Sequence, residues 1–142
     1  MRVRIATLED AEHIARLSGE LGYPANAGET AKRLAAISGN HEHAVLVADD
    51  GGALRGWIHV LASLSLLADA RAEIAALVVD EQHRGRGIGQ ALLEGAEGWA
   101  RQKGCRCLRL HCNVIRSRAH AFYERMGYTV SKLQKDFRKD LG

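Results

Sequence analysis

The segment that most constrains the fold lies between residues 72 and 102. Residues 72–79 read AEIAALVV, which is apolar on both faces after Glu73 and predicts a central, buried strand. A glycine-rich turn, RGRGIG at residues 84–89, follows it. Residues 87–102 then show a helical period whose apolar members share one side: Ile88, Leu92, Ala96 and Trp99. The segment therefore predicts a buried strand, a glycine turn and an amphipathic helix in succession.

Local patterns predict the remaining elements. Helices are expected at Leu8–Leu21, Gly28–Ser38 and Ser117–Met126. Further strands are expected at Arg2–Ala6, Ala44–Ala48, Leu54–Ala62, Cys105–Cys112 and Tyr128–Phe137, with a hairpin turn at residues 49–52 and a loop before Ala72. The first strands are joined by hairpins and the later ones by helices. This order predicts an α/β fold whose sheet is mixed, with antiparallel pairs as in α+β proteins, and carries helices on both faces. No linker or repeat interrupts the chain, so we expect one domain over residues 1–142.

The composition excludes several classes of protein. A formal net charge of +3 over 142 residues is too small to indicate nucleic-acid binding. No run approaches the roughly 18 apolar residues of a membrane helix, so no membrane association is expected. The strand-like start at Met1–Ile5 predicts that no signal peptide precedes the fold, and a cytoplasmic location is expected. Cys105, Cys107 and Cys112 lack zinc-ligand spacing, so we expect reduced cysteines and no metal.

The glycine turn has the features of an anion site. Unpaired amides and the positive dipole end at a helix start attract phosphate, and glycines let the backbone close around it. Arg84 and Arg86 add positive charge. A P-loop would need Gly-Lys-Ser/Thr where Gly89 is followed by Gln90, and a dinucleotide fingerprint would need G-x-G-x-x-G in an early βαβ unit. A glycine turn without a ligand is the remaining alternative.

The same turn matches the Q/R-x-x-G-x-G/A loop of the GNAT acetyltransferases through Arg84, Gly87 and Gly89. Residues 4–10, 72–79 and 119–128 also resemble the opening, the fourth strand and the C-terminal helix and strand of that family. The resemblance implies the GNAT acyl-CoA acyltransferase fold, with a central mixed sheet of six or seven strands. It also implies an acetyl-CoA-dependent N-acetyltransferase, an enzyme that uses acetyl-CoA as acyl-donor cosubstrate.

The resemblance assigns donor-binding residues. The backbone of the strand before the loop pairs with the pantetheine arm in the family, which points to Leu77, Val78 and Val79 and makes their amides donors to the thioester oxygen. Family members often hold an asparagine seven residues before the catalytic tyrosine, where this chain has Arg116; Asn113 is expected to take over that contact. The pyrophosphate loop itself comprises Arg84, Gly85, Arg86, Gly87, Ile88, Gly89 and Gln90.

Two side chains are expected to carry the chemistry. Tyr123 matches the tyrosine that protonates the departing thiolate in many members, although it can also simply pack a helix. Glu73 occupies the position of a general base in several members, and a salt bridge with Arg71 is the alternative. On a regular strand Glu73 and Leu77 would point to the same side, unless a bulge intervenes. His59 and His111 are candidates for lining the acceptor pocket, or are structural.

The acceptor is expected to be a small-molecule primary amine, attacked directly in a ternary complex. Acidic residues that can favour a cationic amine on its approach are Asp49, Asp50, Asp69 and Glu73. A protein Nα or lysine acceptor is the alternative within the same chemistry. A domain that binds acyl-CoA without catalysis is the alternative of another class. Family members are often dimers, so a homodimer is considered.

Overall fold

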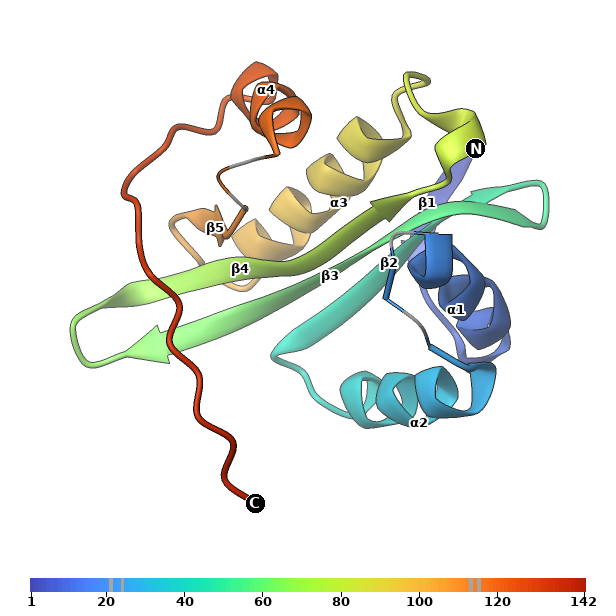
Figure 1. Ribbon diagram of the computed structural model, residues 1–142, viewed down its shortest axis with the longest axis horizontal. Coiled ribbons are helices and arrows are strands. Elements are labelled where there is room, and N and C mark those ends of the chain that lie inside the picture. Colours follow the sequence, from blue (N-terminus) through green and yellow to red (C-terminus); the bar gives the residue numbers. More distant parts are fainter. Residues whose placement is uncertain (21, 24, 113, 115) are drawn as a thin grey trace. The chain divides into compact units, whose positions relative to one another are not determined.

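A mixed sheet organises the first part of the chain (Figure 1). The computed structural model describes residues 1–142 except Leu21, Pro24, Asn113 and Ile115. The chain divides into two compact units, Met1–His111 and Cys112–Gly142, which are described separately. The prediction of one domain over the whole chain is not tested by this division and stays a prediction.

The sheet of the first unit has five strands in the described residues, in the order β1-β2-β3-β4-β5. Neighbours from β1 to β4 are antiparallel, and β5 is parallel to β4. The bounds are β1 Arg2–Ile5, β2 His43–Asp50, β3 Ala53–Ser65, β4 Ala68–Val79 and β5 Leu108–Leu110. The predicted turn joins β2 to β3, where Gly51 and Gly52 take φ values of 63° and 96° that favour glycine.

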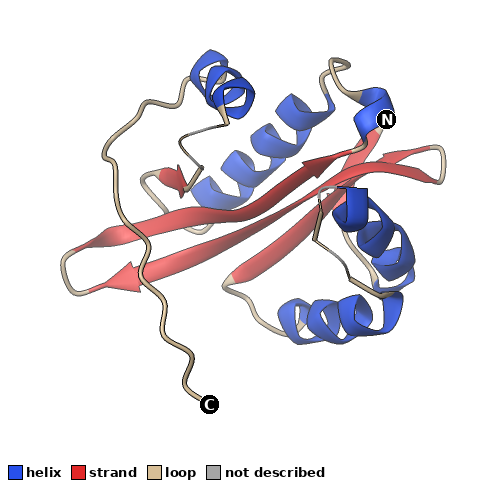
Figure 2. Ribbon diagram, viewed as in Figure 1, coloured by secondary structure: helices blue, strands red, loops and turns tan. Residues whose placement is uncertain are grey.

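Helices cover both faces of this sheet (Figure 2). On one face, α1 (Ala11–Glu20) and α2 (Ala27–Ser38) bury a core with β2, β3 and β4 that includes Leu17, Leu34, Val47 and Val78. On the other face, α3 (Ile88–Gln102) approaches β3 so closely that a Cβ on Gly56 would lie 3.0 Å from Leu92 Cδ1. The α/β class and its two-sided helical cover are therefore confirmed.

An ion-pair cluster fixes the start of the chain to the end of β2. Arg4 donates to both carboxylate oxygens of Asp10 at 2.8 and 2.9 Å, and to Asp49 Oδ2 at 3.0 Å. Asp10 ends the short helix η1 (Leu8–Asp10), is 5% exposed, and also accepts from the Thr7 amide at 2.8 Å. These bonds hold the pKa of the Asp10 carboxyl below its usual range, with the Arg4 hydrogen bonds as the largest cause.

The second unit contains α4 (Ser117–Arg125), followed by residues 126–142 without helix or strand. The predicted strand at Tyr128–Phe137 was therefore wrong. A strand needs a partner for its backbone and a face to bury, and the alternating pattern alone supplies neither. Val130, Leu133 and Phe137 are instead 69%, 78% and 88% exposed.

Three other expectations differ from the structure. The sheet has five strands in the described residues where six or seven were expected. The strand expected at Cys105–Cys112 is shorter, at Leu108–Leu110. The loop expected before Ala72 is the tip of a long hairpin, because β3 extends to Ser65 and β4 begins at Ala68. No helix in the described part of the chain is long and apolar enough to cross a membrane.

Candidate active site

The buried aspartate after β4 anchors the glycine loop. Asp80 is 5% exposed, and its carboxylate accepts from the Gln82 amide at 3.1 Å at the start of the helix η2 (Glu81–His83). His83 Nδ1 lies 3.2 Å and Arg55 Nη1 3.8 Å from the same carboxylate. The Asp80 amide in turn donates to the Arg55 carbonyl at 2.8 Å. These contacts fix where the loop leaves the sheet.

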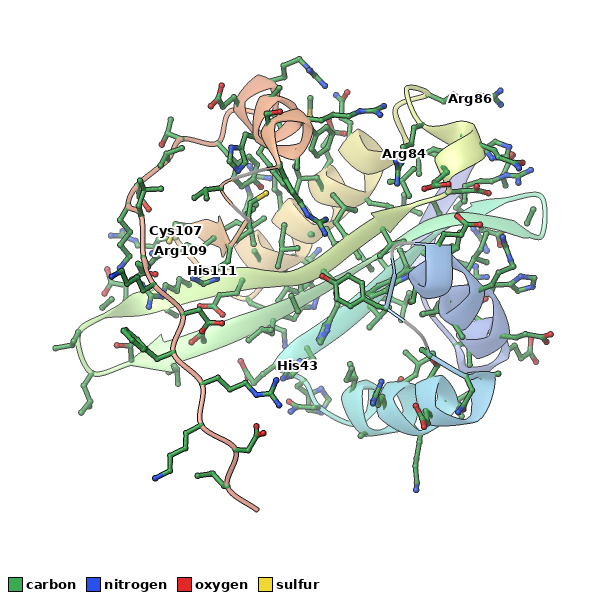
Figure 3. The ribbon with its side chains drawn as sticks, viewed as in Figure 1. His43, Arg84, Arg86, Cys107, Arg109 and His111 are labelled. Atoms are coloured by element: carbon green, nitrogen blue, oxygen red, sulfur yellow. The ribbon has the colours of Figure 1, made fainter. Side chains whose placement is uncertain are left out.

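The loop itself has the backbone shape that its glycines predict. Gly85 and Gly87 both have φ of 80°, a left-handed conformation in which other residues are strained. Gly87 is the N-cap of α3, its carbonyl accepts the first helical bond from Ala91, and no side chain of the described residues caps the helix. The first-turn amides of α3 are thus available to an anion. Arg84 and Arg86 lie exposed on this loop (Figure 3).

Among the described strands, none pairs with the outer edge of β4 beside this loop. β5 pairs only with Ala72–Ile74, and no strand of the described residues continues that ladder along residues 75–79. The Asp80 amide faces β3, because it donates to the Arg55 carbonyl. The Val78 carbonyl faces β3 too, because its oxygen lies 2.7 Å from an ideal Cβ on Gly56. Backbone direction alternates along a strand, so the polar groups of Leu77 and Val79 face the open edge. Of the three predicted backbone donors, Val78 is turned toward β3.

A β-bulge lies on β4 between the predicted base and the open edge. The pairing runs His59 with Ala76 and then Val60 with Ile74, so Ala75 has no partner on β3. Glu73 is opposite Leu61 and Leu77 is opposite Ile58. Because positions 58 and 61 of a regular strand point to opposite faces, Glu73 and Leu77 do too. The condition under which Glu73 and Leu77 would share a side, a strand without a bulge, is therefore not met, because the extra residue reverses the alternation.

Glu73 lies on the face of the sheet that α1 and α2 cover, where it is half-buried. Its carboxylate makes no hydrogen bond or ion pair with any residue that the structure describes. The salt bridge with Arg71, which was the alternative to a catalytic role, is therefore not formed there.

A histidine pair lies on the same face. His59 Nε2 is 2.9 Å from His43 Nδ1, and the two ring centroids are 5.2 Å apart. Burial lowers the pKa of His59, and His43 lowers it further, so a neutral ring is favoured at pH 7. Sequence reasoning missed His43. The signal was present, because a hairpin turning at residues 49–52 brings His43 diagonally next to His59 on one face.

The second unit carries the remaining predicted site residues. Tyr123 lies on α4, half-buried, with its ring edge-on to Phe122 and Tyr128 at 5.1 and 6.0 Å. Burial raises the pKa of Tyr123 to about 12, with a smaller contribution from Cys112. Arg116 is the exposed N-cap of α4. Asn113, the predicted pantetheine contact, lies outside the described residues.

The expected acidic approach is not formed. Asp49 pairs with Arg4, and Asp50 lies 3.4 Å from Arg55, both at the turn between β2 and β3. His43 is level with Glu73 in the sheet, because both are opposite Leu61 of β3. Asp49 is six residues further along β2, so it lies about 20 Å from that level. Asp69 has its side chain 81% exposed. No group of three metal-binding side chains occurs in the part of the chain that the structure describes.

Comparison with known proteins gives consistent results. Residues 8–128 match the family described as "Acetyltransferase (GNAT) family". The chain is 32% identical over 90 residues to the N-acetyltransferase YhfO of Bacillus subtilis, covering 63% of this chain and 60% of that protein. It is 48% identical over 59 residues to the aminoalkylphosphonate N-acetyltransferase of Salmonella typhimurium, covering 42% of this chain and 38% of that protein. The chain thus spans less than two thirds of either relative.

A solved structure shows the same fold. AAC(6')-Iy, in complex with the bisubstrate analogue CoA-S-monomethyl-acetylneamine, superposes with a TM-score of 0.86 at 17% identity. The match covers 98% of this chain and 97% of that one. At this identity the likeness supports the fold and leaves the acceptor open.

Proposed function

Because the chain belongs to the GNAT acetyltransferase family, we propose that it is an acetyl-CoA-dependent N-acetyltransferase that acts on the primary amine of a small molecule. The observation that carries this proposal is the continuity of two backbone features. The open edge of β4 runs through Asp80 and η2 into a glycine loop whose helix start is uncapped by the described side chains. An extended arm that ends in a pyrophosphate fits such an edge followed by such a loop.

The donor's parts are assigned to this chain's groups as follows. The pyrophosphate binds the amides at the start of α3, including those of Ile88, Gly89 and Gln90, with charge from Arg84 and Arg86. Backbone groups of Leu77 and Val79 pair with the pantetheine amides. One of these amides donates to the thioester oxygen and stabilises the charge that develops there.

The transfer is a direct attack in a ternary complex. Glu73 accepts a proton from the acceptor ammonium, and the free amine nitrogen bonds to the thioester carbonyl carbon. The carbon–sulfur bond then breaks, and the thiolate of CoA takes a proton from the Tyr123 hydroxyl. The amide nitrogen gives its remaining extra proton to solvent, the Tyr123 phenolate takes a proton back from solvent, and Glu73 releases the proton that it accepted. The products are an amide and CoA. A phenol with a pKa of about 12 stays protonated at neutral pH, so its proton is available. It is a weaker acid than a thiol with a pKa of about 8.5, so the transfer to the thiolate is uphill.

The small-molecule acceptor has support from similar proteins. The Salmonella typhimurium relative is named for an aminoalkylphosphonate, and the solved neighbour was bound to an analogue that contains acetylneamine. Both names refer to amines of low molecular weight.

The test is an amine panel with detection of the released CoA thiol, run on wild type, Glu73→Gln and Tyr123→Phe. We expect each substitution to lower kcat by about 100-fold or more, since proton transfer contributes about 10²–10⁴. Binding of CoA, measured by thermal shift, is expected to stay unchanged. Matched controls are Glu12→Gln and Tyr23→Phe, both at exposed positions, which should keep full turnover.

Three results would contradict the proposal. Binding of CoA without turnover on any amine would indicate a non-catalytic binding module. Turnover only on peptides would assign the acceptor to protein Nα or lysine groups. An isolated acetyl-enzyme that passes its acetyl group to acceptor would exclude direct attack.

A further inference from the structure

A row of four side chains, three of them polar, crosses the sheet at the level of the proposed base. The pairings connect His43 with Leu61, Leu61 with Glu73, and Glu73 with Arg109. Residues paired across neighbouring strands point to the same face, so these four side chains lie in one row. The row belongs to the face on which Val45 and Val47 contribute to the core with α1 and α2.

Two arginines flank Glu73 in this row. Arg109 is its direct neighbour on β5, at the strand spacing of about 4.8 Å. Arg71 lies two residues before it on β4, opposite Ser63, and therefore on the same face. Cys107, Arg109 and His111 lie together beside β5, away from Arg84 and Arg86 (Figure 3).

Neither guanidinium has an anionic partner within the described residues. The Nε of Arg71 is buried and has no hydrogen-bond acceptor there. A buried donor without an acceptor costs free energy, and a planar guanidinium is suited to bidentate bonds with an oxyacid. Two arginines beside one glutamate also give this part of the face a net positive charge. A polycationic acceptor would require a negative charge there.

We infer that the acceptor amine carries an oxyacid group, a carboxylate or a phosphonate, close to its nitrogen, and that Arg71 and Arg109 bind this group. The inference rests on the proposed function, because it takes Glu73 as the site of the reacting amine. Glu73 and Arg109 start from paired positions whose strands lie about 4.8 Å apart, so an acceptor that reaches both side chains has a short spacer between its two groups. The acceptor class is therefore a small amino acid or aminoalkylphosphonate.

The test compares acids with neutral forms of the same shape. β-Alanine is paired with β-alaninamide, and 2-aminoethylphosphonate with its diethyl ester, each at equal concentration of free amine. We expect kcat/KM for the acids to exceed that for the neutral forms by at least about tenfold, the factor that one charge-assisted hydrogen bond supplies.

The arginine variants locate the subsite. Arg71→Gln and Arg109→Gln should each lower kcat/KM for the acids by about tenfold to a hundredfold, mainly through KM, and leave the neutral forms within about twofold. The KM for acetyl-CoA should not change. Arg106→Gln is the matched control, because Arg106 lies two residues before β5 and its side chain is 82% exposed.

A binding measurement separates failure of the inference from failure of the proposed function. Calorimetry with CoA present should show 2-aminoethylphosphonate binding to wild type and weaker binding to Arg109→Gln. Binding without turnover would support the acid subsite and overturn the proposed activity. Turnover of neutral amines at the same efficiency, or equal losses for acids and neutral forms in the arginine variants, would overturn the inference and leave the activity standing.

Discussion

Asp10 shows how one side chain couples the start of the chain to the sheet. Its carboxylate takes two hydrogen bonds from Arg4 and one from the Thr7 amide, and Arg4 also reaches Asp49. The folded state lowers the pKa of Asp10 below its unfolded value of about 3.9. The carboxylate therefore contributes stability that is fully present above that pH and is lost as the pH falls through the folded pKa.

The residue-scale prediction concerns acid unfolding. Asp10→Asn should lower the free energy of unfolding at pH 7 by about 1–3 kcal/mol, the range for hydrogen bonds to charged groups. The loss should shrink as the pH falls below about 4, because wild type then loses the same charge. Urea unfolding at several pH values measures this. Asp136→Asn, at an exposed position, should change nothing, and an Asp10 effect that is independent of pH would contradict the explanation.

At the scale of single elements, Gly56 of β3 is packed too closely to hold a side chain. An ideal Cβ there would lie 2.7 Å from the Val78 carbonyl oxygen and 3.0 Å from Leu92 of α3. The first contact is with backbone, which cannot move aside as the end of a side chain can. The spacing between β3, β4 and α3 therefore depends on the absence of a side chain at this position.

Gly56→Ala should separate these elements and lower the free energy of unfolding by about 1–3 kcal/mol, as overpacking does. Gly98→Ala is the control, since a Cβ there meets nothing within 4 Å and alanine favours a helix interior. The control should unfold at equal or higher urea concentration than wild type. Equal stability of Gly56→Ala and wild type would show that the sheet accommodates the added carbon.

The sequence predicts those elements whose own residues determine them. The helices of the first unit, the glycine conformations of the donor loop and the turn at Gly51 and Gly52 all follow from local pattern. The bulge at Ala75 does not, because residues 74–78 are uniformly apolar and a one-residue slip leaves that pattern unchanged. The shape of the glycine loop was therefore predictable, whereas the face on which Glu73 lies required the pairing of strands.

At the scale of the whole molecule, helices and strands are unevenly distributed along the chain. The first unit contains every strand that the structure describes, whereas residues 126–142 have neither helix nor strand. Apolar side chains of that terminal segment, such as Leu133 and Phe137, are mostly exposed. The failed strand prediction belongs to this scale, since a strand's existence depends on a partner that its own residues do not specify.

Limited chymotrypsin digestion should therefore cut first after Leu133 or Phe137, because an exposed segment without secondary structure fits a protease site. Leu66 and Leu67 provide an internal comparison: they are fully exposed but lie in the short turn between β3 and β4. Cleavage there should be slower. Mass spectrometry of early fragments distinguishes the two, and first cuts at the hairpin tip would contradict the expectation.

The bulge at Ala75 has a consequence for how such a protein can diversify. Before the bulge, side chains of one sheet face include Glu73 and, beside it, Arg71 and Arg109; after it, the polar backbone groups of Leu77 and Val79 face the outer edge. Under the proposed function, the acceptor is therefore chosen by side chains and the donor is held by main chain, on separate parts of one strand. Substitutions at the first set should then change acceptor choice and leave donor binding intact, because every amino acid except proline provides both main-chain groups.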